Sequence, residues 1–154
     1  MILLLQYMLI FASVLMLVAL GGCFSEHSGV INIGLEGIMV MGALGGALMM
    51  KFLPESTPAI GIIVLVVLAA ILLGVIYSLL LAVAAVNFKA DQTLVGTAMN
   101  LLGTAAATVF VKAMNTAESV DNVSSTIQYI SAKKAFIVNI GSFEFNWFML
   151  LALI

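Results

Sequence analysis

The sequence contains no arginine, one cysteine, one histidine and two prolines. Only 8% of its 154 residues are charged, and the formal net charge is −2. A soluble domain carries about 25% charged residues, so this deficit excludes an ordinary soluble domain. The few lysines form no basic patch, so we expect no nucleic-acid partner. A single cysteine, Cys23, excludes an internal disulfide.

Apolar residues make up 64% of the chain, and the mean hydropathy is +1.30. A helix that spans a bilayer needs about 20 mostly apolar residues. In lipid the backbone must bond internally, so such spans are helices. We therefore predict an all-α fold: a polytopic helix bundle in the lipid bilayer, forming one transmembrane domain over residues 1–154. Its four complete spans are placed at residues 2–20, 30–50, 59–88 and 92–111.

The last forty residues differ in character from the four spans. Residues 113–134 are polar and show no hydrophobic period, which predicts a loop outside the membrane. A last apolar segment starts near Phe143 and reaches only to Ile154. This is too short to cross a bilayer. The pattern predicts the start of a fifth span in a chain that is truncated within it.

Two spans carry polar residues at helical spacing. Ser28, Asn32 and Glu36 are four residues apart, which would place them on one face of a continuous helix. A second stripe follows the fourth span at Thr93, Thr97, Asn100, Thr104 and Thr108.

A carboxylate at mid-membrane costs about 2.5–3.5 kcal/mol, so Glu36 should face a polar partner, a water-filled cavity or the bundle interior. Either stripe can line a pathway or fix packing, and the threonines can bond their own helix. A third interpretation is a helix broken by glycine, with an irregular segment over residues 32–37 that lines a cavity.

Small residues four apart predict close helix contacts in a membrane. Such pairs occur at Gly42 and Gly46, at Ala70 and Gly74, and at Gly103 and Ala107. No catalytic constellation, phosphate-binding loop or metal-spaced cluster is recognisable. We therefore expect a transporter or channel subunit that is not an enzyme and carries no cofactor.

Two blocks of the sequence resemble a known family. Residues 21–43, GGCFSEHSGVINIGLEGIMVMGA, resemble the pattern GG-x-FSE-R-SG-V-x-NIGLEG-x-M of permeases from bacterial ABC importers for nucleosides and simple sugars. A second block, FKADQTLVGTAMNLLG, matches at residues 88–103. The resemblance departs at His27, where arginine is usual. It also ends before the segment that contacts the ATPase in such permeases.

The resemblance implies a multi-pass subunit of the bacterial cell membrane that forms part of a translocation path. It implies three partners: a second permease subunit, a cytoplasmic ABC ATPase that hydrolyses ATP, and an extracytoplasmic substrate-binding lipoprotein. With the stripe residue Ser28 added, the candidate pathway residues are Ser25, Glu26, Ser28, Asn32, Glu36, Asp91, Gln92, Thr97 and Asn100.

Orientation and function each leave an alternative. Counting lysines near the helix ends places the N-terminus in the cytoplasm, whereas the resemblance implies an N-terminus outside. One alternative function is a small proton-coupled multidrug exporter that works as a dimer through Glu36. The other is a membrane assembly subunit with no transport path.

Overall fold

The computed structural model describes residues 2–54, 56–128, 134–140 and 143–146. Its main elements are four helices, each long and apolar enough to cross a membrane. This confirms the prediction of a helical membrane bundle with four complete spans. The helices are α1 (Ile2–His27), α2 (Leu35–Phe52), α3 (Ala59–Val86) and α4 (Gln92–Glu118).

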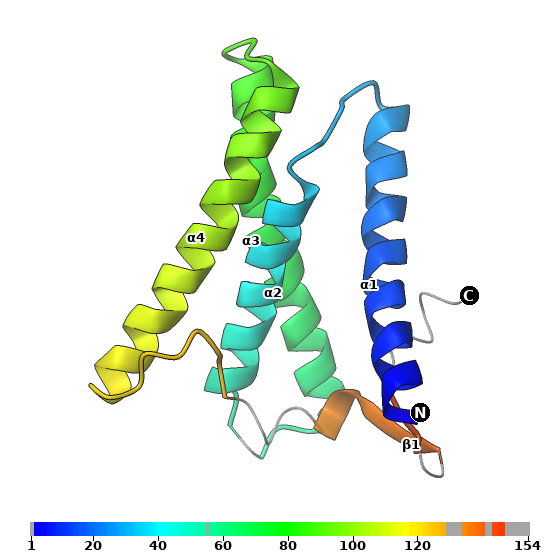
Figure 1. Ribbon diagram of the computed structural model, residues 1–154, viewed down its shortest axis with the longest axis vertical. Helices are drawn as coiled ribbons and strands as arrows, with labels where there is room; N and C mark the ends of the chain where they lie inside the picture. The colour runs from blue at the N-terminus through cyan, green and yellow to red at the C-terminus, as the bar shows by residue number, and fades with distance from the viewer. Residues whose placement is uncertain (1, 55, 129–133, 141–142, 147–154) are drawn as a thin grey trace.

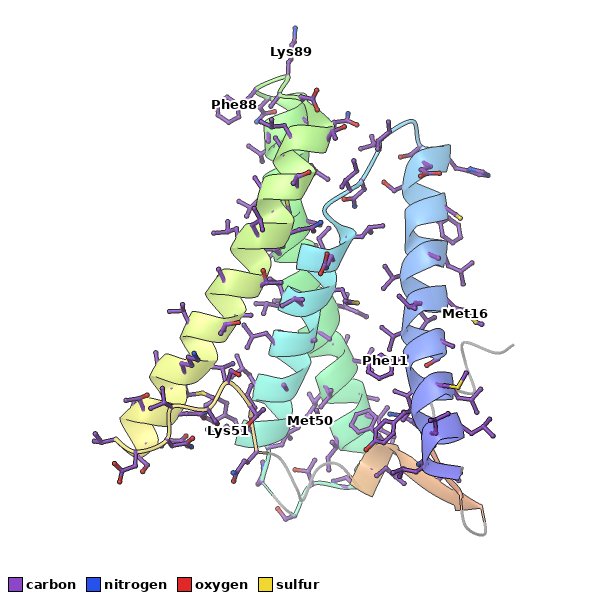
Figure 2. All side chains as sticks on the ribbon, viewed as in Figure 1. Phe11, Met16, Met50, Lys51, Phe88 and Lys89 are labelled. Atoms are coloured by element: carbon purple, nitrogen blue, oxygen red, sulfur yellow. The ribbon has the colours of Figure 1, made fainter. Side chains whose placement is uncertain are left out.

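The four helices run alternately up and down (Figure 1). Residues 28–34 and the connection from α3 to α4 lie at one end of the bundle. Phe88 and Lys89 mark that end, and Met50 and Lys51 lie at the opposite end (Figure 2). Lys89 has a φ of 50°, a left-handed conformation that reverses the chain between α3 and α4. Charged side chains thus lie where long apolar helices end.

Glycines on α2 allow close packing against α3 and α4. A Cβ atom at Gly45 would lie 2.8 Å from the Ala69 carbonyl oxygen on α3. One at Gly46 would lie 3.6 Å from the Ala70 Cβ atom. On α4, a Cβ at Gly103 would lie 3.0 Å from the Gly37 backbone. The predicted contacts at small residues are confirmed for Gly46 and Gly103, and an added Cβ atom would force a shift at Gly45 and Gly103 but would fit at ordinary contact distance at Gly46.

Helix α1 is longer than predicted and packs less closely. It continues through Gly21 and Gly22 to His27, so the predicted end at residue 20 is wrong. A Cβ atom at Gly22 would lie 3.1 Å from Leu35 Cδ1, so this glycine lets α1 approach α2. Most of the apolar side chains along α1 are exposed. Contacts of α1 involve α2 and the strand β2.

Helix α4 also runs further than predicted, because it ends at Glu118 and not near residue 111. Two contacts hold its last turns. The Lys51 ammonium lies 2.6 Å from the Glu118 carboxylate and links the ends of α2 and α4. The buried Asn115 side chain donates to the carbonyl oxygens of Ser124 and Thr126, each at 2.9 Å. The non-helical polar segment therefore starts at Ser119, and its place outside the membrane stays a prediction.

The predicted start of the fifth span is not helical. After a short 3-10 helix, η1 (Lys134–Phe136), the strands β1 (Ile137–Ile140) and β2 (Phe143–Asn146) pair antiparallel. Both strands are rich in β-branched and aromatic residues, and Gly-Ser between them is a hairpin signature. Residues 147–154, which hold the rest of the predicted fifth span, lie outside the described residues.

The close approach at Gly37 predicts a packing defect when a methyl group is added. A Cβ atom there would lie 2.6 Å from the Met99 carbonyl oxygen. We expect Gly37→Ala to destabilise the purified protein by about 1–3 kcal/mol, the usual cost of overpacking. The control is Gly21→Ala, because nothing lies within 4 Å of a Cβ at that position. Thermal unfolding followed by circular dichroism measures both variants, and equal Tm values would contradict the packing described here.

Candidate functional site

The first polar stripe runs across the start of α2, and this start differs from the predicted helix. The chain is not helical over residues 28–34, and α2 starts at Leu35 after an N-cap at Gly34. Gly29 has a φ of 80°, a conformation that favours glycine. The prediction that Ser28, Asn32 and Glu36 share one helix face is therefore wrong. The alternative of an irregular segment is confirmed for residues 32–34, whereas residues 35–37 are helical.

Two side chains of α4 form hydrogen bonds with the backbone of this irregular segment and of the first turn of α2. The Ile31 N–H donates to Gln92 Oε1 at 3.0 Å. Further along, the Asn100 side chain donates from Nδ2 to the Ile33 carbonyl at 2.9 Å. Its Oδ1 accepts from the Gly37 N–H at 2.8 Å. Gln92 and Asn100 are eight residues apart, about 12 Å along α4, and their side chains bond both ends of the short segment from Ile31 to Ile33.

The same turn of α4 also bonds to α3. The Tyr77 hydroxyl donates to the Met99 carbonyl oxygen at 2.6 Å, and both residues are buried. A Cβ atom at Gly103 would lie 3.2 Å from the Tyr77 hydroxyl oxygen. Three elements therefore meet at one place. We name it the Asn100 junction, and it consists of Ile33, Gly37, Tyr77, Met99, Asn100 and Gly103.

Glycines bring the irregular segment into contact with α4 one turn before the junction. A Cβ atom at Gly96 would lie 2.8 Å from the Gly34 nitrogen. A Cβ at Gly34 would lie 3.4 Å from the Gly96 Cα atom. The two backbones therefore touch without intervening side chains. This contact brings the Asn100 side chain within hydrogen-bond distance of the Ile33 carbonyl and of the Gly37 N–H.

Glu36 lies in the first turn of α2, where the helix dipole favours a negative charge. Its side chain is exposed, and it forms no hydrogen bond or ion pair with the residues that the structure describes. The bundle interior is therefore not its environment within this part of the chain. Two of the predicted environments for the carboxylate remain, a water-filled cavity and a partner outside the described residues.

Several other predicted pathway residues stabilise local backbone. Ser25 Oγ donates to the Val30 carbonyl at 2.9 Å, and Ser28 Oγ donates to the Ser25 carbonyl at 2.6 Å. Both bonds turn the chain after α1. The Asp91 carboxylate caps α4 by accepting from the N–H groups of Thr93 and Leu94 at 2.8 and 3.1 Å. Glu26 lies in the last turn of α1.

The threonine stripe bonds to its own helix. Thr97 Oγ1 donates to the Thr93 carbonyl at 2.8 Å, and Thr108 Oγ1 donates to the Thr104 carbonyl at 2.7 Å. These side chains are exposed on one face of α4. The structure therefore separates the stripe into two parts: Asn100 joins helices, whereas the threonines leave a polar outer face.

A small cavity lies beside the irregular segment. Its volume is about 220 Å³, and its polar lining comes from Asn32, Ser78 and Gln92. The Asn32 Oδ1 atom is buried and has no hydrogen-bond partner among the described residues. Sequence reasoning missed Tyr77 and Ser78, since two adjacent hydroxyl residues in the apolar α3 helix form no periodic pattern. No group of three potential metal ligands occurs in the described part of the chain.

Comparisons with known proteins agree with this architecture. The family model described as the permease component of branched-chain amino acid transport systems matches residues 4–154. No solved structure gives a significant match.

Curated relatives include two nucleoside transporter subunits. The guanosine ABC transporter permease NupQ of Bacillus subtilis is 46% identical over 104 residues, which cover 68% of this chain and 32% of NupQ. The nucleoside ABC transporter permease NupC of Lactococcus lactis is 38% identical over 102 residues, covering 64% of this chain and 31% of NupC. A putative glucose ABC transporter permease of Haloferax volcanii is 35% identical over 99 residues, covering 64% of this chain and 28% of that protein.

This chain spans about a third of the length of NupQ and NupC. The family model nevertheless covers all four helices and the whole Asn100 junction. The chain is therefore a multi-pass protein of the bacterial plasma membrane, and it belongs to the family of permease components of branched-chain amino acid transport systems.

Proposed function

We propose that the chain is a permease subunit of an ABC importer and forms part of the translocation path for nucleosides or simple sugars. The observation that carries the proposal is the non-helical segment before α2, which Asn100 holds together with the first turn of α2 from α4. Irregular backbone at membrane depth is tolerated where it is buried in protein or lines a cavity, and discontinuous helices form solute sites in transporters. The identity to guanosine and nucleoside permeases supports the same function.

The predicted pathway residues take three roles in this proposal. The non-helical segment before α2 and the first turn of α2 hold or are supported by Asn32, Glu36, Gln92 and Asn100, and Thr97 contributes to the polar face of α4. Ser25, Glu26, Ser28 and Asp91 shape the ends of α1 and α4 at the same membrane surface. Glu36 faces water in the path or a polar group of a second permease subunit. An exposed carboxylate without a partner in the described residues is consistent with either environment.

The partners follow from the proposed importer. A separate cytoplasmic ATPase would hydrolyse ATP, a second permease subunit would complete the path, and a lipoprotein would deliver the solute outside. We expect all three to co-purify with an affinity-tagged chain from its native membrane, and mass spectrometry identifies them. A homodimer without an ATPase would contradict the importer and favour the proton-coupled exporter. In that case Glu36→Gln would abolish pH-dependent efflux.

The importer also requires a defined orientation. The N-terminus and the loop after α4 would lie outside, on the side of the lipoprotein. Ser125 is exposed in that loop. We expect Ser125→Cys, in a Cys23→Ser background, to react with a membrane-impermeant maleimide added to intact cells. Labelling that occurs only after the membrane is permeabilised would show that the loop lies in the cytoplasm and would contradict this orientation.

The Asn100 junction generates a further prediction. Asn100→Ala removes the partners of the Ile33 carbonyl and the Gly37 N–H. Leaving one buried polar group without a partner costs about 1–3 kcal/mol, so the variant should unfold at a clearly lower temperature and lose transport. Thr97→Ala is the control on the same helix face, because it removes only a bond to its own helix. Its stability should change by less than about 0.5 kcal/mol.

Thermal unfolding in detergent and solute uptake into cells measure the two variants side by side. If Asn100→Ala and Thr97→Ala unfolded at the same temperature, the junction would not hold α2. A fall in uptake with unchanged stability would instead place Asn100 in direct contact with the solute.

A further inference from the structure

The cavity beside the irregular segment lies where three elements meet, and we name it the Asn32 cavity. Its lining comes from Val30 and Asn32 of the segment, from α3, and from Gln92 at the start of α4. Leu81 of α3, only 5% exposed, forms part of its apolar wall. The volume of about 220 Å³ is far larger than the roughly 10–15 Å³ that a water molecule requires. The cavity therefore has room for small polar molecules.

The side-chain carbonyl of Asn32 needs a hydrogen-bond donor. Its Oδ1 atom is buried and has no partner among the described residues. Buried polar atoms in proteins nearly always have a partner, either a protein group or ordered water. The backbone on both sides of this residue is fixed, because the Ile31 N–H donates to Gln92 and the Ile33 carbonyl accepts from Asn100. A donor for the Asn32 oxygen therefore has to occupy the space beside this fixed segment.

Ser78 and Gln92 supply the other polar groups of the cavity. Ser78 Oγ donates to the Val75 carbonyl at 2.8 Å, so its hydrogen is used and its lone pairs can accept. Gln92 Oε1 accepts from the Ile31 N–H, and its Nε2 group forms no hydrogen bond with the described residues, so it can donate. The lining thus offers two acceptors and one donor. A water molecule donates two hydrogens and accepts in return, and about three hydrogen bonds are usual for a buried water.

Other occupants match this lining less well. A purely apolar occupant, such as an acyl chain, would leave the buried Asn32 oxygen without a donor, which is costly. A divalent metal ion prefers about six oxygen ligands. Only three polar side chains line the cavity among the described residues, and one of them presents a donor. Water satisfies the oxygen without requiring further ligands.

We propose that the Asn32 cavity is a binding site for ordered water, in which one molecule donates to Asn32 Oδ1 and also bonds Ser78 and Gln92. The water joins the irregular segment to α3. Helix α4 holds Ile31 and Ile33 directly, and the water holds the side chain of the residue between them. This site goes beyond the proposed transport function and does not depend on it, because no solute or partner takes part.

Hydroxyl-radical footprinting with X-rays tests the site in the purified full chain. Radiolysis of ordered water produces radicals at the site, and these oxidise the side chains next to it. Leu81 and Ile62 form a matched pair, because both are buried in α3, at 5% and 8% exposed, and only Leu81 lines the cavity. Leucine and isoleucine also react similarly with the radical. We expect Leu81 to be oxidised roughly fivefold faster than Ile62, as measured by mass spectrometry.

Two variants test whether the Asn32 oxygen holds the water. Asn32→Leu removes the acceptor at similar size, so oxidation of Leu81 should fall to the rate of Ile62. Asn32→Asp keeps an acceptor oxygen and should keep Leu81 oxidation. Asn87→Leu is the control, because it makes the same change at the exposed end of α3, outside the lining. Its Leu81 oxidation should equal that of the unmodified chain.

Equal oxidation of Leu81 and Ile62 in the unmodified chain would overturn the proposal, since it would show a cavity that is dry or filled by an apolar group. This comparison needs no variant, so it decides the question even if a substitution prevents folding. Unchanged Leu81 oxidation in Asn32→Leu would contradict the role of the oxygen. Loss of oxidation in both Asn32→Leu and Asn32→Asp would contradict it too, because the acceptor is kept in Asn32→Asp.

Discussion

A backbone segment that is not helical must find partners for its polar groups, and one carboxamide supplies two of them here. Asn100 donates to the Ile33 carbonyl and accepts from the Gly37 N–H, so both of its polar atoms bond across the first turn of α2. Leucine would leave both groups without partners, and aspartate would replace the acceptor but not the donor. The non-helical segment before α2 and the asparagine on α4 therefore depend on each other.

The rest of the bundle is arranged around this bond. Gly96 and Gly103 lie about one turn before and after Asn100, and each touches backbone of the segment that Asn100 holds. Tyr77 adds α3 to the same turn through the Met99 carbonyl. Close backbone approach is the main source of helix affinity in lipid, where burial of apolar surface contributes little. At the opposite end, Lys51 with Glu118 and Asn115 with the loop fix α2 and α4 without glycine contacts.

Long apolar runs with few charges made the four helices predictable from sequence. The hydrogen bonds between the helices were not predictable. The partners of Asn100 lie 63 and 67 residues earlier in the sequence, so no local pattern could reveal them. The spacing of Ser28, Asn32 and Glu36 fits a helix, but Gly29 and Gly34 interrupt it. The error at β2 had a readable signal, because Gly-Ser stands between two short runs of strand-forming residues. Glu36 shows the limit of sequence-based prediction most clearly. The free-energy cost of its carboxylate in lipid was predictable, but its exposed position in the first turn of α2 was not.

The polar residues of α4 connect the two ends of the structure. From Asn100 the same helix face continues through Thr104 to Thr108. Each threonine bonds its own helix, so the face stays polar without attaching α4 to a neighbour. Asn100 fixes one end of the face and the loop closes the other. This face of α4 is therefore anchored at both ends, and Thr104 between them bonds only to its own helix.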